Sequence, residues 1–395
     1  MNISHAIGLH MHQPPGNLRF LLDHEEHEAR QIIHCYERPA RYALNYPDVA
    51  RLHVGFSGIL LEQLRDPDVV DRYRDIVDIP AALAKYREAT NIELIGMGYY
   101  HPIFPLIPTD DWDDHLKRGR DIVEETFGRA PDGFWPPEMA FCMEMVPALD
   151  RAGYEYVVVD GVHVEPTREG EEVDQYRPYR ATYDGHSITV VPRDRDISNA
   201  QESGLEPGWL ADEITHKVGE SPHPEEDRLV TTWSDGENGG WFRQMDEGAG
   251  FFGHFFAPYM ERVRAGNYPA TPVALSDYLE RHPPAHEATV RTGAWNVGST
   301  SGYDFEQWAG SANQREAIED VVQVSSRYWE LQDNEDALSD EGRRHLEEAR
   351  RLVLEAETSC YLFWGDSWLP QLEEKLKTAR ARLDKVEETG SRQPA

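Results

Sequence analysis

Lysine and cysteine are both scarce in this sequence, and each shortage limits what the protein can be. Only six of its 39 basic residues are lysines, and the three cysteines, Cys35, Cys142 and Cys360, include no Cys-x-x-Cys pair. A disulfide framework and a cysteine zinc site are therefore both unexpected. The sequence also contains no run that approaches the roughly 18 uninterrupted apolar residues of a membrane-spanning helix.

A signal-peptide pattern is lacking as well, because the first ten residues have no basic start followed by an apolar run. The prediction is a soluble, cytoplasmic protein. Its 395 residues include 72 acidic side chains and carry a formal net charge of −33. A field this negative repels phosphates and anionic headgroups, so nucleic acid, membrane surfaces and acidic polysaccharides are excluded as main partners. The expected partner is a neutral oligo- or polysaccharide substrate, and the sequence leaves the oligomeric state open.

The acidity is added to a globular composition, since 39% of the residues are hydrophobic and 10% are aromatic. Hyperthermophilic proteins enrich lysine together with glutamate, whereas here arginine replaces lysine among many carboxylates. This pattern favours adaptation to high salt, where counterions screen the repulsion among the carboxylates. An ordinary acidic cytosolic enzyme is the alternative.

Up to about residue 300 the sequence alternates β-like runs with amphipathic helical stretches. Helical patterns include residues 69–86 and 112–127. Strand-like runs bounded by Gly, Pro, Asp or His occur at residues 3–9, 52–56, 92–95, 133–135, 154–159, 188–191 and 229–233. Such alternation is typical of βα units whose parallel strands are buried on both faces. With about seven strands, the expected closure is a barrel.

From about residue 310 the sequence becomes helical. Residues 311–388 are rich in Glu, Arg, Leu and Ala at helical spacing. We therefore predict a barrel domain over residues 1–305 and a C-terminal helical domain over residues 306–395. The segment 361–370, YLFWGDSWLP, is too apolar for an idle linker and is expected to pack back on the barrel.

Reactive side chains of a parallel barrel lie where its strands end and its βα loops begin. The strand-like runs end in His10-Met11-His12-Gln13, Tyr99-Tyr100-His101, Trp135-Pro136-Pro137-Glu138, Asp160, Arg193-Asp194 and Asp235-Gly236-Glu237-Asn238. Aromatic rings stack on the apolar faces of pyranose rings, while His, Asp, Glu and Arg hydrogen-bond the hydroxyl groups. A sugar is therefore the expected substrate.

Cleaving a glycosidic bond requires two carboxyl groups, and Glu138 and Asp235 form the best pair. The Trp-Pro-Pro turn before Glu138 would fix its direction, and burial at the end of an apolar strand would raise the pKa of Asp235 as a proton donor. Each residue also has an ordinary explanation, because Pro-Pro-Glu commonly begins a helix and Asp-Gly is a common turn.

His10 and His12 point to the same side of a strand, a spacing that could hold a metal ion. The alternative is that both rings hydrogen-bond substrate hydroxyls. A metal-dependent carbohydrate deacetylase is accordingly one alternative to a glycosidase, although no third ligand stands at a fixed spacing. A noncatalytic glycan-binding protein is the other, opposed by the presence of both carboxyl groups.

Together these motifs resemble those of glycoside hydrolase family 57, in the same order along the chain. The motif residues are His12-Gln13-Pro14, Glu93 with residues 99–106, Phe134-Trp135-Pro136-Pro137-Glu138, Asp235-Gly236-Glu237-Asn238, and Trp295 with Phe305, Trp308 and Gly310. The second of these is most similar to that of the amylopullulanase-like members. Five motifs in order are far more specific than any one alone.

The resemblance implies the α/β class, as an incomplete seven-stranded parallel (β/α) barrel followed by a helical domain. It also implies a retaining α-glycosidase that hydrolyses or transfers α-glucans such as starch, maltooligosaccharides or glycogen, like α-amylases, amylopullulanases and glucanotransferases. Glu138 would be the nucleophile and Asp235 the general acid/base, with no metal and no other cofactor. The substrate-binding residues expected are His10, His12, Gln13, Glu93, His101, Trp135, Asp160, Glu237, Trp241, Trp295 and Trp364.

The sequence departs from the family pattern at two places. Residues 356–365 resemble a family segment that reads SDWFWWYG, but its Asp is Cys360 here and one Trp is Leu362. The loop after Glu237 carries Gly239-Gly240 before Trp241. These differences leave the substrate and the choice between α-1,4 and α-1,6 linkages open, but not the reaction class.

We predict that the fold needs molar salt or divalent cations for full stability, because a net charge of −33 pushes the compact state apart unless counterions screen it. A thermal melt against KCl measures this, and its midpoint should rise from low to molar salt. A midpoint that stays flat or falls would remove the interpretation of salt adaptation.

Overall fold

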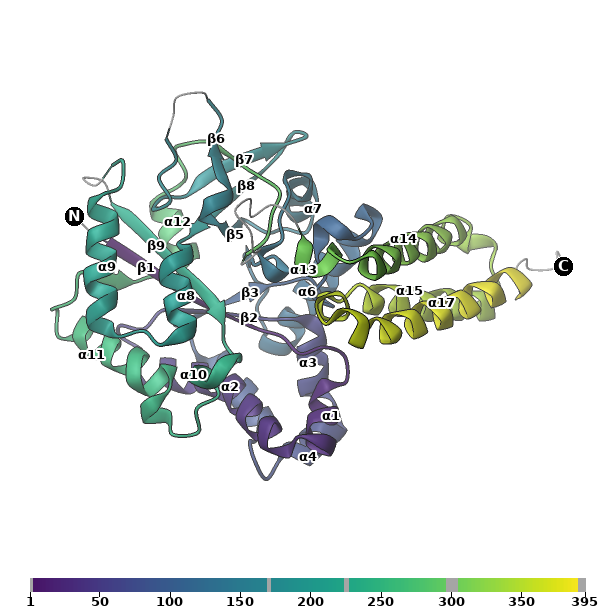
Figure 1. Cartoon of the computed structure of the whole chain (residues 1–395), viewed down its shortest axis with the longest axis horizontal. Coiled ribbons are helices and arrows are strands. Elements are labelled where there is room, and N and C mark those ends of the chain that lie inside the picture. The colour runs from purple at the N-terminus through teal and green to yellow at the C-terminus, as the bar shows by residue number, and fades with distance from the viewer. Residues whose placement is uncertain (1–2, 169–171, 224–226, 296–304, 390–395) are drawn as a thin grey trace.

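The computed structural model describes residues 3–168, 172–223, 227–295 and 305–389. Figure 1 shows a body of strands and helices from which a bundle of helices extends as an arm toward the C-terminus. The N-terminus lies at the opposite end of the molecule. Within the described ranges, no helix is long and apolar enough to cross a membrane.

Seven parallel strands of the described residues form the centre of the body, in the spatial order β9, β1, β2, β3, β4, β5, β8. They are β1 (Ile3–Met11), β2 (Leu52–Phe56), β3 (Ile92–Gly96), β4 (Gly133–Phe134), β5 (Tyr156–Asp160), β8 (His186–Arg193) and β9 (Arg228–Asp235). The two outer strands, β8 and β9, form no ladder in the described part of the chain, although Asp194 N donates to Thr231 O at 2.8 Å. The sheet is an incomplete seven-stranded barrel, which confirms the expected α/β fold class.

Further strands lengthen the sheet beyond what the sequence predicted. β10 (Ala270–Pro272) pairs parallel with the start of β1, and β7 (Tyr179–Tyr183) pairs antiparallel with β8. The hairpin between β7 and β8 turns at Asp184-Gly185, where both residues have positive φ, so the Asp-Gly pair was its signal. A separate ribbon joins β6 (Val164–Pro166) to β11 (Ala288–Val290). β6, β10 and β11 have only three residues each, too few for a period-2 pattern.

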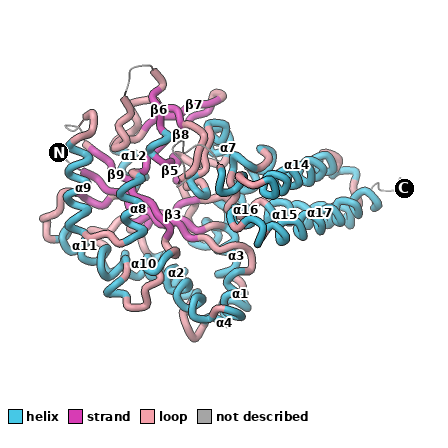
Figure 2. The backbone as a smooth tube through the Cα atoms, viewed as in Figure 1, coloured by secondary structure: helices cyan, strands magenta, loops and turns pink. Residues whose placement is uncertain are grey.

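Helices surround the strands, as Figure 2 shows. They are α1 (Asn17–His24), α2 (Glu26–Asn45), α3 (Gly58–Arg65), α4 (Pro67–Tyr73), α5 (Ile79–Glu88), α6 (Trp112–Phe127), α7 (Val146–Arg151), α8 (Arg195–Ser203), α9 (Pro207–Gly219), α10 (Gly239–Phe242), α11 (Ala257–Arg264) and α12 (Leu275–Arg281). The prediction of one helix over residues 69–86 is wrong. The first helix, α4, ends at Tyr73, and a second helix, α5, begins at Ile79. Asp78 caps α5 by accepting a hydrogen bond from Ala81 N, and a proline stands in the first turn.

Large aromatic side chains fill the interior of the barrel. Trp135, Tyr156, Trp233 and Trp295 belong to one buried cluster. Gly8 on β1 lies opposite Trp233 on β9, and a Cβ at this position would lie 2.0 Å from the indole. The glycine therefore makes room for the tryptophan. Because side chains fill the interior of the barrel, a cavity at the carboxyl ends of its strands does not continue through it.

The C-terminal arm consists of α13 (Glu306–Ala309), α14 (Ala312–Gln332), α15 (Asp340–Ala356), α16 (Ser359–Phe363) and α17 (Leu369–Thr389). Figure 1 shows α14, α15 and α17 lying alongside one another. Their shared core contains Leu346 and Val353 from α15 and Leu376 and Leu383 from α17, in each case two turns apart. The domain division at residue 305 stays a prediction, because residues 296–304 lie outside the described ranges.

A buried ionic cluster fastens this arm to the barrel. Arg350 on α15 contacts Asp111 Oδ1 through Nη1 at 2.5 Å and Asp114 Oδ2 through Nε at 2.6 Å. Asp111, which precedes α6, also accepts hydrogen bonds from Ser325 Oγ at 2.6 Å and Trp329 Nε1 at 2.8 Å on α14. Removing one partner of such a buried pair leaves the other charge without compensation.

We predict that Arg350→Ala lowers the free energy of unfolding by about 3–5 kcal/mol, because Asp111 then stays buried without its cation. Urea titration measures the change. The matched control is Arg74→Ala, since Arg74 pairs with Asp71 on the exposed surface, and it should cost less than about 1 kcal/mol. Equal small losses in both variants would show that the cluster does not hold the arm.

Candidate active site

One cavity of about 900 Å³ opens where the barrel strands end and the helical arm meets the barrel. This volume lies toward the upper end of the range typical of small-molecule sites, about 300–1,000 Å³. Nine of the thirteen expected site residues line it: His10, His12, Gln13, His101, Glu138, Asp235, Glu237, Trp295 and Trp364. Segments far apart in the sequence thus meet at one mouth, as the barrel rule predicted.

Asp235 is the last residue of β9, and its register partner on β1 is His10. His10 Nε2 lies 2.7 Å from Asp235 Oδ1, and Asn238 Nδ2 donates to Asp235 Oδ2 at 2.7 Å. Both carboxylate oxygens are therefore held by hydrogen bonds, and Asp235 has one fixed orientation. The expectation of an ordinary Asp-Gly turn does not account for these contacts.

Glu138 follows β4 in a strained turn. Its φ of 56° and that of Met139, 51°, lie in the left-handed region, which is unfavourable for side chains with a Cβ. Trp295 holds the turn, because its backbone N donates to Glu138 O at 2.9 Å and its indole Nε1 donates to Glu138 Oε2 at 2.8 Å. The alternative that Pro-Pro-Glu simply begins a helix is wrong, since Glu138 departs from helical geometry.

The imidazole of His10 is clamped between aromatic rings. It stacks on Trp135 at 4.1 Å between ring centroids, with 17° between the planes. The Trp295 indole meets it edge-on at 5.2 Å. His10 contacts Asp235, Trp295 contacts Glu138, and the two rings contact each other. A continuous series of side-chain contacts therefore runs from one carboxyl group to the other.

Two further histidines, His12 and His101, are held by contacts with both the barrel and the helical arm. The rings of His12 and His101 stack at 3.9 Å with 6° between their planes. His12 Nδ1 lies 2.8 Å from Ser57 Oγ on the barrel side, and its Nε2 lies 3.3 Å from Cys360 Sγ on α16. His101 Nδ1 lies 2.9 Å from Ser359 Oγ, also on α16. The helical arm therefore positions both histidines.

These contacts bear on whether His10 and His12 share a metal ion. Their ring nitrogens engage different partners, Asp235 for His10 and Ser57 with Cys360 for His12. Across the described ranges, no group of three or more His, Cys, Asp or Glu residues is arranged to hold a metal. The arrangement found is one of hydrogen-bonding side chains around a cavity.

The two carboxyl groups have pKa values shifted in opposite directions. Burial raises the pKa of Glu138 from 4.5 to about 7, and the negative charge of Asp235 adds to this. Burial also acts to raise the pKa of Asp235, but the neighbouring His10 outweighs it and lowers that pKa below 3.8. The expectation that burial raises the pKa of Asp235 is therefore wrong for the free protein, because the sequence did not reveal the contact with His10.

Glu237 is a third carboxyl group in the cavity wall. Its Oε1 accepts hydrogen bonds from His12 N at 2.8 Å and Gln13 Nε2 at 3.2 Å. Burial raises its pKa to about 7. Glu237 thereby joins the loop after β9 to the loop after β1.

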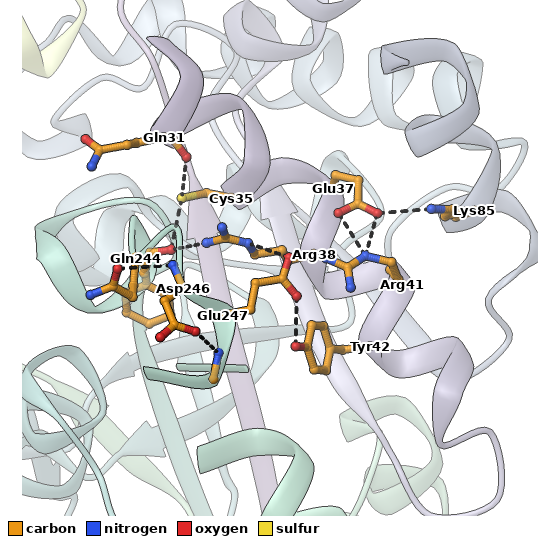
Figure 3. Close-up of polar contacts among 12 residues, drawn as sticks. Gln31, Cys35, Glu37, Arg38, Arg41, Tyr42, Lys85, Gln244, Asp246 and Glu247 are labelled. Carbon is orange, nitrogen blue, oxygen red and sulfur yellow. Dashed lines mark hydrogen bonds and ion pairs between the residues drawn. The ribbon is translucent and has the colours of Figure 1, made fainter. Parts of the chain in front are cut away.

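Polar contacts with α2 hold the loop that follows Glu237, as Figure 3 shows. Arg38 Nη1 donates to Phe242 O at 2.7 Å, and Glu247 accepts hydrogen bonds from Arg41 Nη2 at 2.6 Å and Tyr42 Oη at 2.9 Å. Since this loop directly follows Glu237, which lines the cavity, its attachment to α2 helps to hold that wall of the cavity in place.

Four expected site residues lie outside the cavity lining. Glu93 stands at the start of β3, at the opposite end of the barrel, where it contacts His53 and accepts a hydrogen bond from Tyr156 Oη. Asp160 is buried beside Arg195, whose Nε donates to it at 2.9 Å. The ring of Trp135 lies beneath His10, and Trp241 packs against Phe251 and His254.

The cavity also contains residues that sequence reasoning did not select. These include Asn17 and Phe20 on α1, Arg243 after β9, and Ser359, Phe363 and Trp368 from the arm. Phe363 and Trp368 belong to the apolar segment 361–370 and line the cavity together with barrel residues, while the packing of the whole segment on the barrel stays a prediction. Phe20 had no comparable signal, because an aromatic residue on a surface helix usually reports core packing.

Comparisons with known proteins show the family of the chain. The model of the family described as glycosyl hydrolase family 57 matches residues 6–290. An α-amylase of Dictyoglomus thermophilum is 24% identical over 328 residues, which are 82% of this chain and 43% of that protein. A 4-α-glucanotransferase of Thermococcus litoralis is 28% identical over 198 residues, 49% of this chain and 27% of that protein.

Solved structures share the fold. The branching enzyme of Pyrococcus horikoshii superimposes with a TM-score of 0.70 at 18% identity, covering 97% of this chain and 88% of that one. The α-amylase AmyC of Thermotoga maritima gives 0.66 at 16% identity, covering 98% and 93%.

The fold, together with the carboxyl and imidazole groups around the cavity, places the chain among barrel proteins that carry a polar site at the ends of their strands. Within that class, the chain belongs to glycosyl hydrolase family 57. It spans less than half the length of the two curated relatives described above.

We predict that Glu138→Gln makes the protein more stable than the wild type at about pH 8. The folded state keeps a proton on Glu138 up to about pH 7, whereas the unfolded chain loses it near pH 4.5, so wild-type stability falls as the pH rises through that window. The gain should be on the order of 3 kcal/mol and should vanish below about pH 4.

Urea unfolding at both pH values measures this difference. The matched control is Glu144→Gln, an exposed glutamate in the next turn, which should give no comparable gain in stability at about pH 8. Glu138→Gln and wild type with the same stability at about pH 8 would contradict the raised pKa of this carboxyl group.

Proposed function

We propose that the protein is a retaining α-glycosidase that acts on α-glucans such as starch, maltooligosaccharides or glycogen, by hydrolysis or by transglycosylation. The observation that carries the proposal is the convergence of Glu138 and Asp235 on one cavity, each held in a single orientation by named partners. The relatives support the substrate class, since their names include α-amylase and 4-α-glucanotransferase.

In the proposed mechanism Glu138 attacks the anomeric carbon, and Asp235 protonates the departing oxygen. The covalent glycosyl-enzyme is then opened by an acceptor whose proton passes to Asp235. Water as acceptor gives hydrolysis, and a sugar hydroxyl gives transfer. The Trp295 indole donates to Glu138 Oε2, which leaves Oε1 to attack.

The remaining cavity residues are proposed to bind sugars. His12, His101, Gln13 and Glu237 present hydrogen-bonding groups beside the carboxyl pair, and Trp295 offers an aromatic ring. At the outer end, Phe20 is 50% exposed and Trp364 is 56% exposed, and both line the same cavity. Exposed rings in a sugar site are suited to stacking on pyranose faces.

We also propose that the protein works in the cytoplasm of a salt-adapted organism. The excess of carboxylates and of arginine over lysine supports the salt adaptation. All three cysteines are free thiols, which supports a reducing compartment. The same acidity supports neutral glucans over nucleic acid or membrane surfaces as partners.

The proposal is tested by incubating the protein in molar KCl with starch, maltoheptaose and pullulan and separating the products by chromatography. Proton NMR of the first product should show the α-anomer before mutarotation, because a double displacement retains the configuration. Glu138→Gln should lose all measurable turnover while still binding maltoheptaose. Initial release of the β-anomer, or near-normal turnover by Glu138→Gln, would overturn the mechanism.

A further inference from the structure

His10 occupies a position that bears on how Asp235 could deliver a proton. Its side chain is buried, and its Nε2 contacts Asp235 Oδ1 at 2.7 Å, the short distance typical of a charge-assisted hydrogen bond. Trp135 covers one face of the ring and Trp295 meets it edge-on. The imidazole is therefore held against the carboxylate by packing on more than one side.

The groups around His10 decide which of them carries charge. The charged and titratable neighbours come from several elements packed against it. They are Asp235 at the end of β9, Glu237 after β9, Glu138 after β4, Glu202 on α8, and the imidazoles of His12 and His101. Burial lowers the pKa of His12 to about 3 and that of His101 well below 6.5, so both rings are neutral. His10 is thus an imidazole among carboxyl groups, next to two neutral imidazoles.

Burial alone would lower the pKa of His10 too, but the Asp235 carboxylate, with Glu138 and Glu237, raises it above 6.5. The same contact lowers the pKa of Asp235. In the free protein the proton therefore lies on His10, and Asp235 is a carboxylate. A proton donor needs the reverse, so the proton has to come from the adjacent ring.

We propose that His10 is a positioning residue that shares one proton with Asp235, so that the proton for the leaving group is stored on the His10–Asp235 pair. This inference rests on the proposed function for its role in catalysis, but the sharing itself is a property of the pair. It gives His10 a role other than that of a sugar-binding histidine.

The proton balance closes over both steps. In the first step the proton passes from His10 Nε2 to Asp235 Oδ1 and on to the glycosidic oxygen. The bond from that oxygen to the anomeric carbon breaks, and Glu138 bonds to the carbon. In the second step the acceptor oxygen bonds to the carbon, the bond to Glu138 breaks, and the acceptor proton returns through Asp235 to His10.

The charge balance favours this arrangement in a buried site. Before the first step His10 is a cation while Asp235 and Glu138 are anions. After it His10 is neutral, Asp235 is an anion and Glu138 is an uncharged ester. The summed charge of the three groups is the same in both states, so little charge has to be created where it is poorly solvated.

Histidine-selective NMR tests the sharing without any turnover. The signal lost in His10→Gln, or in His10→Asn if that variant folds better, identifies His10. In wild type it should titrate with a midpoint above 6.5, and in Asp235→Asn the midpoint should fall. The ring of His12 is the internal control and should stay neutral in both proteins. A His10 that titrates below 6.5 in wild type, or one unaffected by Asp235→Asn, overturns the inference.

Kinetics of His10→Gln distinguish proton sharing from a merely structural role, because glutamine keeps a hydrogen-bond donor but cannot exchange a proton. We expect kcat/KM on maltoheptaose to fall about 10²-fold, and on an aryl α-glucoside with a good leaving group by less than about tenfold. The acid limb of the pH profile should move to higher pH, because Glu138 loses a nearby positive charge. An equal loss on both substrates with an unmoved acid limb would overturn the inference.

The two measurements separate this inference from the proposed function. A wild type that shows the NMR shift but turns over no α-glucan would refute the proposed function and leave the shared proton standing. A wild type that turns over α-glucans while His10 titrates below 6.5 would refute the shared proton alone.

Discussion

The parallel pairing of β1 with β9 is the constraint on which the site depends. It places His10 directly beside Asp235 at the mouth of the barrel, where His10 is buried and most of the Asp235 side chain is covered. A carboxylate in such a place is costly to desolvate unless a cation or several hydrogen bonds compensate it. The imidazole provides that compensation, and the packing of Trp135 and Trp295 keeps it in place. Through Trp295 the same arrangement reaches Glu138.

Residues of both the barrel and the helical arm form the mouth of the cavity. His101 and Glu138 both have φ near 60°, a backbone conformation that persists only where neighbours hold it. Trp295 holds Glu138, and Ser359 on α16 holds His101 by a backbone contact of 3.0 Å and a side-chain contact of 2.9 Å. The ion pair of Arg350 with Asp111 keeps the arm in position for these contacts. Strain at the site is thus balanced by interactions elsewhere.

Opposite pKa shifts of two neighbouring carboxyl groups follow from small differences in their surroundings. Each side chain is only 21% exposed, but Asp235 contacts an imidazole whereas Glu138 contacts an uncharged indole. Glu138 therefore loses solvation without gaining a cation in direct contact, and its ionised form costs stability. A site of this kind holds a carboxyl group with a shifted pKa at a cost in folding stability. In a chain with a net charge of −33, counterions have to offset a similar cost over the whole surface.

The fold class and most of the rim of the barrel could be predicted from the amino-acid sequence. Alternating strand and helix patterns are local, and strand ends carry their reactive residues with them, so Glu138 and Asp235 could be assigned to one mouth. Tertiary structure decided what depends on neighbours distant in sequence. Glu93 lies at the far end of the barrel because it begins its strand instead of ending it, and Phe20 and Cys360 reach the cavity through helix packing. The lowered pKa of Asp235 could not be predicted from the residues of β9 alone. It results from the contact with His10, and the register of β1 against β9 sets that contact.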